Sequence, residues 1–298
     1  MTATRIDGTA IARRIRERLR AQIEKEQETN PRFKPAFTII QELGTYVRMK
    51  LKAAEEANII CNLVHYPKST TELQLLEHIT SANNDPSVHG VLVQLPVPDH
   101  ISEHAITSAV ADEKDVDGFG VANIGELAKR RGRPLFVPCT PKGVMALLQE
   151  SGVDLVGKHA VVVGRSDIVG SPVSHLLRNA DATVTVCHRR TEGLENFIKH
   201  ADVVVVAIGQ PNYVKGEWLK PGAVVIDVGT NYIPDESKKS GQRLVGDVDF
   251  DSAIEVASQI TPVPGGVGPM TVAMLLQNVV DSATYYFERE RAQKNHNG

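Results

Sequence analysis

The sequence predicts an α/β protein with two domains. Short runs of β-branched residues alternate with helical patterns, and strands joined by helices of this size pair in parallel through right-handed crossovers. A chain of 298 residues is long enough for two domains with well-filled cores. The C-terminal half adds four continuous apolar runs, which are typical of strands buried on both faces of a parallel sheet.

The N-terminal half begins with an amphipathic helix, predicted by an apolar stripe at helical spacing: Ile11, Ile15, Leu19 and Ile23. Strands are then expected at 35–41, 61–67 and 90–98, and helices at 45–59, 70–83 and 102–110. Thr70 is expected to open the helix at 70–83, because threonine is a common N-cap.

Thr140 and Pro141 mark the boundary between the domains. A threonine N-cap followed by proline at the first helical position is a strong helix start, and we place the junction on or just beyond this helix. The predicted first domain comprises 1–143 plus 271–298, and the second comprises 144–270. Strands of the second domain are expected at 160–164, 183–187, 202–209 and 223–229.

A proline- and glycine-rich loop at 261–271 precedes the last predicted helix. The apolar stripe of this helix is Val272, Leu275, Val279, Ala283 and Tyr286. We expect the helix to cross back and pack on the first domain.

Composition argues against several classes of partner. The formal net charge is −3 and the pI is about 6.4, so nucleic acid is not expected as the main partner. No apolar run of about 18 residues predicts a membrane span, and the N-terminus lacks the apolar core of a signal peptide. The arginines of the N-terminal segment would also fit an organelle presequence. Asp7, Glu17 and the apolar stripe from Ile11 to Ile23 favour a surface helix of the folded domain instead. We therefore expect a cytoplasmic protein.

The three cysteines are Cys61, Cys139 and Cys187. They are widely spaced and form no CxxC pair, which predicts reduced thiols and no metal site.

Residues 161–173 have the pattern of a Rossmann-type dinucleotide-binding turn, in which phosphates bind backbone N–H groups at a helix N-terminus. Gly164 and Gly170 are too far apart for GxGxxG, so an ordinary α/β turn stays an alternative. The next strand ends in His188, Arg189 and Arg190, where an NAD enzyme usually has Asp or Glu. Arginines there suit a 2′-phosphate and predict NADP, although a solvated charge pair is the common alternative.

Polar candidates for chemistry lie mostly in the first half. Tyr46 and Lys50 share one helix face. A lysine on a helix is usually a solvated charge, but a buried one can act as a general acid or base near neutral pH. Gln94 follows an apolar strand, where α/β sites commonly lie, or it caps the strand end.

Asp115 and Asp117 form a DxD before Gly118. Two carboxylates before a glycine are more often a turn than a metal site, and no EF-hand spacing follows. Asp117 could instead accept hydrogen bonds from an amino-pyrimidine edge of a ligand. Cys139 has no assigned histidine partner and is interpreted as packing.

Nine separated motifs now stand in order along nearly the whole chain. They are YVRMK (46–50), VQLP (93–96), DVDG (115–118), PCTPKG (138–143), GRSDIVGSP (164–172), IGQP (208–211), IDVGTN (226–231), GDV (246–248) and TPVPGGVGPMT (261–271). Together they resemble the methylenetetrahydrofolate dehydrogenase/cyclohydrolase family, and most of all the corresponding domain of eukaryotic, fungal-like C1-tetrahydrofolate synthases.

The resemblance implies two reactions in one cleft between the domains. The first is the NADP-dependent oxidation of 5,10-methylenetetrahydrofolate to 5,10-methenyltetrahydrofolate, and the second is hydrolysis to 10-formyltetrahydrofolate. It also implies a homodimer through the second domain. The chain is then either a free-standing enzyme or the front part of a longer protein with a formyltetrahydrofolate ligase domain.

The resemblance also implies roles for particular residues. Lys50 matches the catalytic lysine, Tyr46 the aromatic that lies against the folate, Gln94 the group that holds and tunes the lysine, and Asp117 the carboxylate that grips the pterin. Further folate-lining positions are Val47, Arg48, Met49, Val93, Leu95, Pro264, Gly265, Gly266, Val267 and Gly268. Cofactor-binding positions are Gly164, Arg165, Ser166, His188, Arg189, Arg190, Thr230 and Thr271.

Two departures from the family pattern stand out. The family has a longer loop, with a glycine and a serine, where this chain has only residues 42–45, which puts the lid over the folate in doubt. Bifunctional relatives commonly have serine where Arg189 stands.

Two alternative functions stay open. One is a dehydrogenase without the hydrolase step, against which Lys50 and Gln94 argue. The other is a non-enzymatic dinucleotide-binding module, against which the polar strand ends argue.

Overall fold

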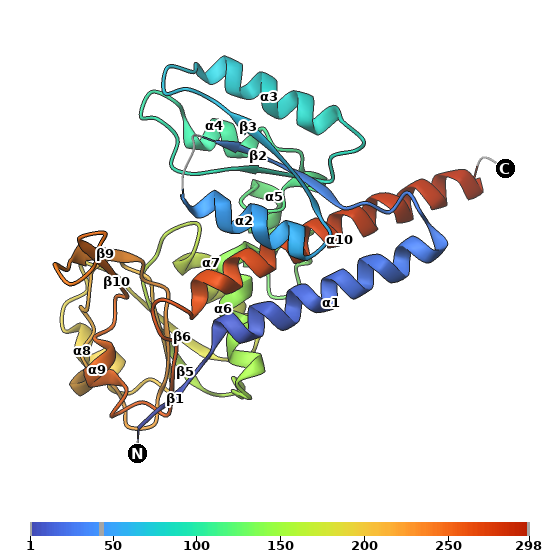
Figure 1. The fold of residues 1–298 in the computed structure, drawn as a ribbon. Coiled ribbons are helices and arrows are strands. Elements are labelled where there is room, and N and C mark those ends of the chain that lie inside the picture. The colour runs from blue at the N-terminus through green and yellow to red at the C-terminus, as the bar shows by residue number, and fades with distance from the viewer. Residues whose placement is uncertain (1, 42–44, 297–298) are drawn as a thin grey trace. The chain divides into compact units, whose positions relative to one another are not determined.

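The computed structural model describes residues 2–41 and 45–296, without the side chains of Thr45, Tyr46 and His296 (Figure 1). The short loop discussed above therefore lies largely outside the described residues. The chain divides into two compact units. One comprises Met1–Ala12, Leu127–Arg131 and Thr140–Thr271, and the other comprises Arg13–Glu126, Gly132–Cys139 and Val272–Gly298. The predicted boundaries at 143 and 270 stay a prediction.

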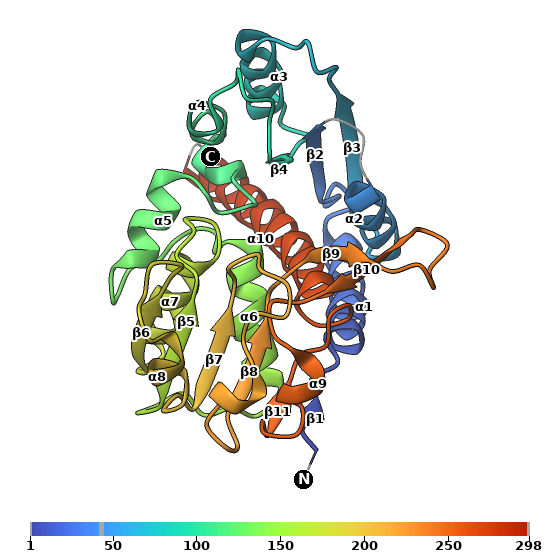
Figure 2. The ribbon, with the colours of Figure 1, turned by 90° about the vertical axis from the view of Figure 1, so that its left-hand side faces the viewer.

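The first of these units contains a six-stranded parallel sheet, which confirms the predicted α/β class (Figure 2). In spatial order its strands are β1 (Thr4–Arg5), β11 (Gln259–Ile260), β8 (Val224–Asp227), β7 (Val203–Val206), β5 (His159–Val163) and β6 (Thr183–Cys187). A small antiparallel pair, β9 (Asn231–Pro234) and β10 (Gln242–Val245), stands apart from it. The sequence patterns predicted neither β1 nor this pair.

Three of the four apolar strands of this sheet are buried as predicted. β7 and β8 are buried throughout, and β5 is buried from Ala160 onward. The prediction is wrong for β6, in which Thr183 and Val186 are exposed. The reason is that β6 is the edge strand, so it has a strand neighbour on one side only.

Helices of this unit are α6 (Cys139–Glu150), α7 (Gly170–Asn179), α8 (Leu194–Ile198) and α9 (Phe250–Ala253). Thr140 is not the N-cap that was expected, because α6 already begins at Cys139. Its hydroxyl instead lies 3.0 Å from the hydroxyl of Thr271.

The second unit contains a three-stranded parallel sheet in the order β3 (Ile60–His65), β2 (Ala36–Gln41) and β4 (Gly90–Val93). Its shorter helices are α2 (Thr45–Glu56), α3 (Glu72–Asn84), α4 (Glu103–Ser108) and α5 (Val121–Ala128). The N-cap of α3 is Thr71 and not Thr70, because Thr71 and Gln74 form a reciprocal capping box.

Two long helices complete the fold: α1 (Gly8–Thr29) and α10 (Val267–His296). All four residues of the predicted α1 stripe are buried. α10 returns to the first half of the chain as predicted, since Asn278 donates to Val116 O and Ser282 donates to His89 O. Its stripe ends on buried Phe287, while Tyr286 is half-buried. Among the described residues, no helix has the length and apolar character needed to cross a membrane.

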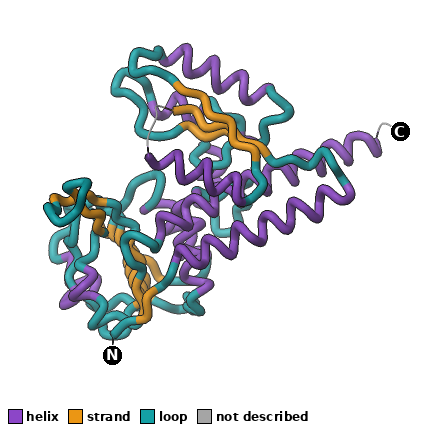
Figure 3. The backbone as a smooth tube through the Cα atoms, in the orientation of Figure 1, coloured by secondary structure: helices purple, strands orange, loops and turns teal. Residues whose placement is uncertain are grey.

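The two faces of the three-stranded sheet differ, and this difference positions the site. Ile40 and Val93 belong to an apolar cluster with Leu75 and Ile79 of α3. Because side chains alternate along strands, the residues that follow them point to the other face. α3 and α2 lie on opposite sides of these strands (Figure 1; the strands are orange in Figure 3).

Candidate active site

Lys50 is a buried lysine on α2. Only 5% of its surface is exposed, and Nζ donates a 2.8 Å hydrogen bond to Oε1 of Gln94. Burial lowers the pKa of Lys50 below the ordinary 10.5, and the nearby Asp117 carboxylate opposes that shift only in part. The solvated-lysine alternative is therefore wrong, and the lowered pKa makes the neutral amine that proton transfer requires easier to form.

Gln94 has a fixed amide orientation at the carboxyl end of β4. Its backbone N–H donates to Ile40 O at 3.0 Å, and its Nε2 donates to Leu95 O at 2.9 Å. With the nitrogen held in this way, only Oε1 can face Lys50. A neutral acceptor holds the amine in place without supplying the charge that would stabilise its protonated form.

Asp115 and Asp117 have different surroundings. Asp115 accepts N–H groups from Gly118, Gly120 and Asn123 at 3.1, 2.7 and 2.8 Å, so it builds the turn. Burial raises its pKa to about 6. Asp117 is half-buried, and the Cys139 thiol lies 3.6 Å from its Oδ1. Burial raises the pKa of Asp117, whereas the nearby charge of Lys50 lowers it.

The other predicted folate-lining residues divide into two groups. Val47, three residues before Lys50, is buried, whereas Arg48 and Met49 are exposed. The Val93 side chain lies in the α3 cluster, on the face away from Lys50. The side chain of Tyr46 lies outside the described residues. Lys50, Gln94 and Asp117 are therefore the predicted catalytic residues that the structure brings together.

A tight turn joins β5 to α7 at the predicted phosphate loop. Gly164 has φ +135°, and a Cβ there would overlap Ala207 O. A Cβ on Gly170 would overlap the backbone of Gly164 and lie 2.7 Å from Arg165 N. Glycine is thus required at both positions for the start of the helix to pack against the loop.

Ser166 lies in the loop before α7, which begins at Gly170. Its Oγ accepts the N–H groups of Val169 and Gly170 at 3.2 and 3.3 Å, and its carbonyl accepts Ser171 N at 3.0 Å. The backbone N–H groups of 165–168 donate to no described group, and these residues are exposed. These N–H groups are therefore the ones that the predicted phosphate loop leaves available to an anion.

Arg189 and Arg190 lie in the turn that follows β6. Gly164 N donates to Cys187 O at 2.8 Å, so this turn begins beside the phosphate loop. Both arginines are exposed, and neither forms an ion pair with a described residue. His188 Nδ1 accepts Arg190 N at 3.2 Å and shapes the turn. Two unpaired cations beside a loop with free N–H groups fit a dinucleotide with a 2′-phosphate.

Replacing Gly164 by alanine should destabilise the dinucleotide unit. A side chain at the positive φ of Gly164 costs up to about 3 kcal/mol of stability, and the overlap of its Cβ with Ala207 O adds to this cost. Gly157→Ala is the matched control, because Gly157 has φ +71° but no atom within 4 Å of the added Cβ. Thermal unfolding should show a clearly larger loss for Gly164→Ala, and equal losses would contradict the packing argument.

The remaining residues predicted to bind the cofactor or the folate lie in the same unit as the phosphate loop. Thr230 is exposed, and Thr271 donates to Val267 O at 3.3 Å in the first turn of α10. In the loop Pro264–Gly268, Gly265 has φ +108° and its carbonyl accepts Thr9 N at 3.0 Å. The loop is therefore anchored by its backbone to the start of α1.

The sequence patterns missed a pair of buried aspartates, Asp227 at the end of β8 and Asp247 after β10. Asp227 accepts the N–H groups of Gly229, Asp247 and Val248, each at 2.9 Å. Asp247 accepts those of Ile208 and Gly209 at 2.7 and 3.0 Å. Burial raises the pKa of Asp227 to about 7. For Asp227, a polar residue at the end of an apolar strand was the available signal, and a similar signal identified Gln94. Asp247 follows β10, which is not an apolar strand, so no such signal marked it.

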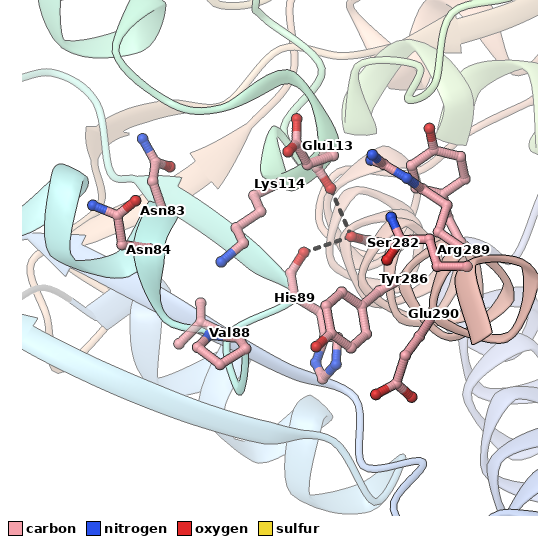
Figure 4. A pocket seen from close by; sticks show the side chains of 13 residues that line it. Asn83, Asn84, Val88, His89, Glu113, Lys114, Ser282, Tyr286, Arg289 and Glu290 are labelled. Carbon is pink, nitrogen blue, oxygen red and sulfur yellow. Dashed lines mark hydrogen bonds between the residues drawn. The ribbon is translucent and has the colours of Figure 1, made fainter. Parts of the chain in front are cut away.

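A separate cavity of about 380 Å³ lies beside α10 (Figure 4). Lys114 lines it, and its Nζ donates to Ala82 O and Asp85 O at 2.9 and 2.7 Å, which are carbonyls at the end of α3. Ser282 donates to the carbonyls of His89 and Glu113 in the same region. These polar groups have structural partners, so the cavity is a weaker candidate. Within the described residues, no cluster of His, Cys, Asp and Glu could hold a metal ion.

Two family models match the chain. Residues 6–117 match the catalytic domain of tetrahydrofolate dehydrogenase/cyclohydrolase, and residues 138–287 match its NAD(P)-binding domain. The chain is 56% identical over 97% of its length to the cytoplasmic C-1-tetrahydrofolate synthase of Schizosaccharomyces pombe, but it spans only 31% of that relative.

Two further proteins match over nearly their whole length. The bifunctional protein FolD 2 of Arabidopsis thaliana is 52% identical, over 96% of this chain and 97% of that protein. The solved structure of the Trypanosoma brucei methylenetetrahydrofolate dehydrogenase-cyclohydrolase, complexed with NADP and an inhibitor, is 43% identical with a TM-score of 0.92 and covers 96% of this chain and 98% of that chain. The buried lysine and the glycine turn thus stand in a chain that belongs to the tetrahydrofolate dehydrogenase/cyclohydrolase family.

Proposed function

We propose that this chain oxidises 5,10-methylenetetrahydrofolate to 5,10-methenyltetrahydrofolate with NADP and then hydrolyses the product to 10-formyltetrahydrofolate. The observation that carries the proposal is Lys50, a buried amine held at 2.8 Å by a neutral amide. A dehydrogenase alone needs a bound folate and a bound dinucleotide. The second, hydrolytic step also needs a base for the proton of water, and Lys50 supplies that base.

The roles of the three central residues follow from their surroundings. The methenyl product is a cation, so a neutral amine beside it is favoured over an ammonium group. Gln94 keeps Lys50 in place, and the lowered pKa makes the neutral form accessible. Asp117 is an acceptor beside this amine and is proposed to hold the amino-pyrimidine edge of the pterin.

The dinucleotide unit provides the second half of the proposal. The exposed loop Arg165–Ile168, together with Arg189 and Arg190, would hold the phosphates of NADP, including the 2′-phosphate. When bound, the cofactor supplies a hydride acceptor. The chain's own contribution there is to position the phosphates through backbone N–H groups and arginine side chains.

The proposal is tested with purified protein and two absorbance signals. Added methylenetetrahydrofolate and NADP should yield NADPH, and added methenyltetrahydrofolate should lose its absorbance faster than in buffer. NADPH formation without hydrolysis would reduce the proposal to a dehydrogenase. If neither absorbance change occurs, only the non-enzymatic dinucleotide-binding module remains as a function.

We further propose a homodimer and a cytoplasmic location. If this chain is part of a longer protein, like the relative of which it spans only 31%, we expect a formyltetrahydrofolate ligase domain in the remainder. That domain would have 10-formyltetrahydrofolate in common with this region. Analytical ultracentrifugation of this chain tests the dimer, since a monomer at micromolar concentration would contradict it.

A further inference from the structure

A second glutamine amide stands beside Gln94 at the carboxyl end of the three-stranded sheet. β2 ends at Gln41, and its parallel register pairs Ile40 with Val93. Gln41 and Gln94 are therefore lateral neighbours on adjacent strands, about 5 Å apart. Both follow residues of the α3 cluster, so both side chains point to the opposite face, which is the face of Lys50.

The Gln41 side chain is buried, and its amide nitrogen lacks an acceptor. Only 2% of the residue is exposed, and Nε2 donates to no group among the described residues. A buried donor without a partner is unfavourable and rare, so it needs an explanation. The other such atom among the described residues, Nε2 of His89, belongs to a ring that packs edge-on with Tyr286 at 5.4 Å between centroids.

We propose that Nε2 of Gln41 donates a hydrogen bond to the oxygen of the water that attacks the methenyl carbon, an inference that rests on the proposed function. That water needs a base for its proton and a donor that orients its oxygen. Gln94 is less suited as the donor, because its Nε2 already gives one of its two hydrogens to Leu95 O and its Oε1 accepts from Lys50. Gln41 is its strand neighbour and has both N–H donors available.

The hydration step balances with these two groups. The water oxygen forms a bond to the methenyl carbon while one water proton passes to Nζ of neutral Lys50. The resulting ammonium returns that proton to N5 as the bond between the carbon and N5 breaks. The hydroxyl proton leaves to solvent as the formyl C=O forms, so the cation plus water gives 10-formyltetrahydrofolate plus one proton. Gln41 remains a donor throughout and transfers no proton.

Gln41→Met tests the proposal, because methionine keeps the length of the side chain and removes both donors. We expect hydrolysis of methenyltetrahydrofolate to fall by about 100-fold in kcat, as for a misplaced reactant. Oxidation of methylenetetrahydrofolate consumes no water and should stay near the rate of the unaltered protein. The melting temperature should be unchanged or higher, since an apolar group replaces an unpaired polar one.

Thr38→Val is the matched control, because Thr38 is a buried polar residue on the same strand and is on the other face from Gln41. It should leave the ratio of the two activities unchanged. An unchanged ratio in Gln41→Met would overturn the proposal, and so would an equal loss of both activities or a rise in the folate KM alone, which would indicate folate binding. A clear fall in melting temperature would indicate a structural partner instead. If the unaltered protein hydrolyses nothing, the proposed function fails, whichever way the variant behaves.

Discussion

Lys50→Met should remove hydrolysis of methenyltetrahydrofolate while leaving NADP binding intact. Loss of a positioned general base costs about 10²–10⁴-fold in rate, and no other described amine contacts Gln94. In the unaltered protein, hydrolysis should rise with pH as Lys50 loses its proton, at a pKa below the ordinary 10.5. This rising limb should be absent in the variant. The measurements are kcat against pH for hydrolysis and the Kd for NADP.

Lys52→Met is the matched control for this prediction. Lys52 lies two residues farther along α2, its side chain is 78% exposed, and it forms a 4.0 Å ion pair with Glu56. Its removal should leave both activities unchanged, because exposed pairs contribute little. Hydrolysis by Lys50→Met at the rate of the Lys52→Met control would remove Lys50 from the mechanism.

Replacing Arg189 and Arg190 by serine should abolish the preference for NADP over NAD. A hydrogen bond to a charged group contributes about 1.5–3 kcal/mol, which corresponds to roughly 10–100-fold in affinity for each bond that is lost. Activity with NAD should change little, because NAD has no 2′-phosphate. The measurements are kcat/KM with each cofactor and calorimetric binding of 2′,5′-ADP and of AMP.

The control for general electrostatics is Arg243→Ser. Arg243 lies on β10 in the same unit, with a half-exposed side chain 3.7 Å from Asp235. This variant should bind 2′,5′-ADP as the unaltered protein does. An unchanged preference for NADP in the double variant would show that Arg189 and Arg190 are only a solvated charge pair.

Whether a segment forms a helix or a strand could be predicted from sequence, because this depends on the spacing of apolar residues close together along the chain. Apolar periodicity located the strands from β2 to β8, and the four-residue spacing of the α1 stripe gave a buried face. The exact starts were less certain: Thr71 caps α3 in place of Thr70, and α6 begins at Cys139. At such boundaries neighbouring residues can offer similar caps, and in α3 the capping box between Thr71 and Gln74 decides between them.

The burial of individual strands could not be predicted from their composition. The pattern of β6 is interpreted as an apolar run like that of β5, although it contains Thr183 and Thr185. β6 is the sheet edge, and strand order depends on contacts between distant segments. The hydrogen bonds of Asp227 and Asp247 also could not be predicted from composition. The two residues are 20 apart in sequence, and the antiparallel pair β9–β10 lies between them.

The sequence alone determined the alternation of strands and helices, the glycine turn, the paired arginines and the family resemblance, because each is written in residues close together along the chain. The tertiary structure decided which lysine loses its water, which way the Gln94 amide points, and that the amide of Gln41 stays unpaired beside it. Those properties depend on desolvation and on hydrogen bonds between strands and helices that are up to 44 residues apart.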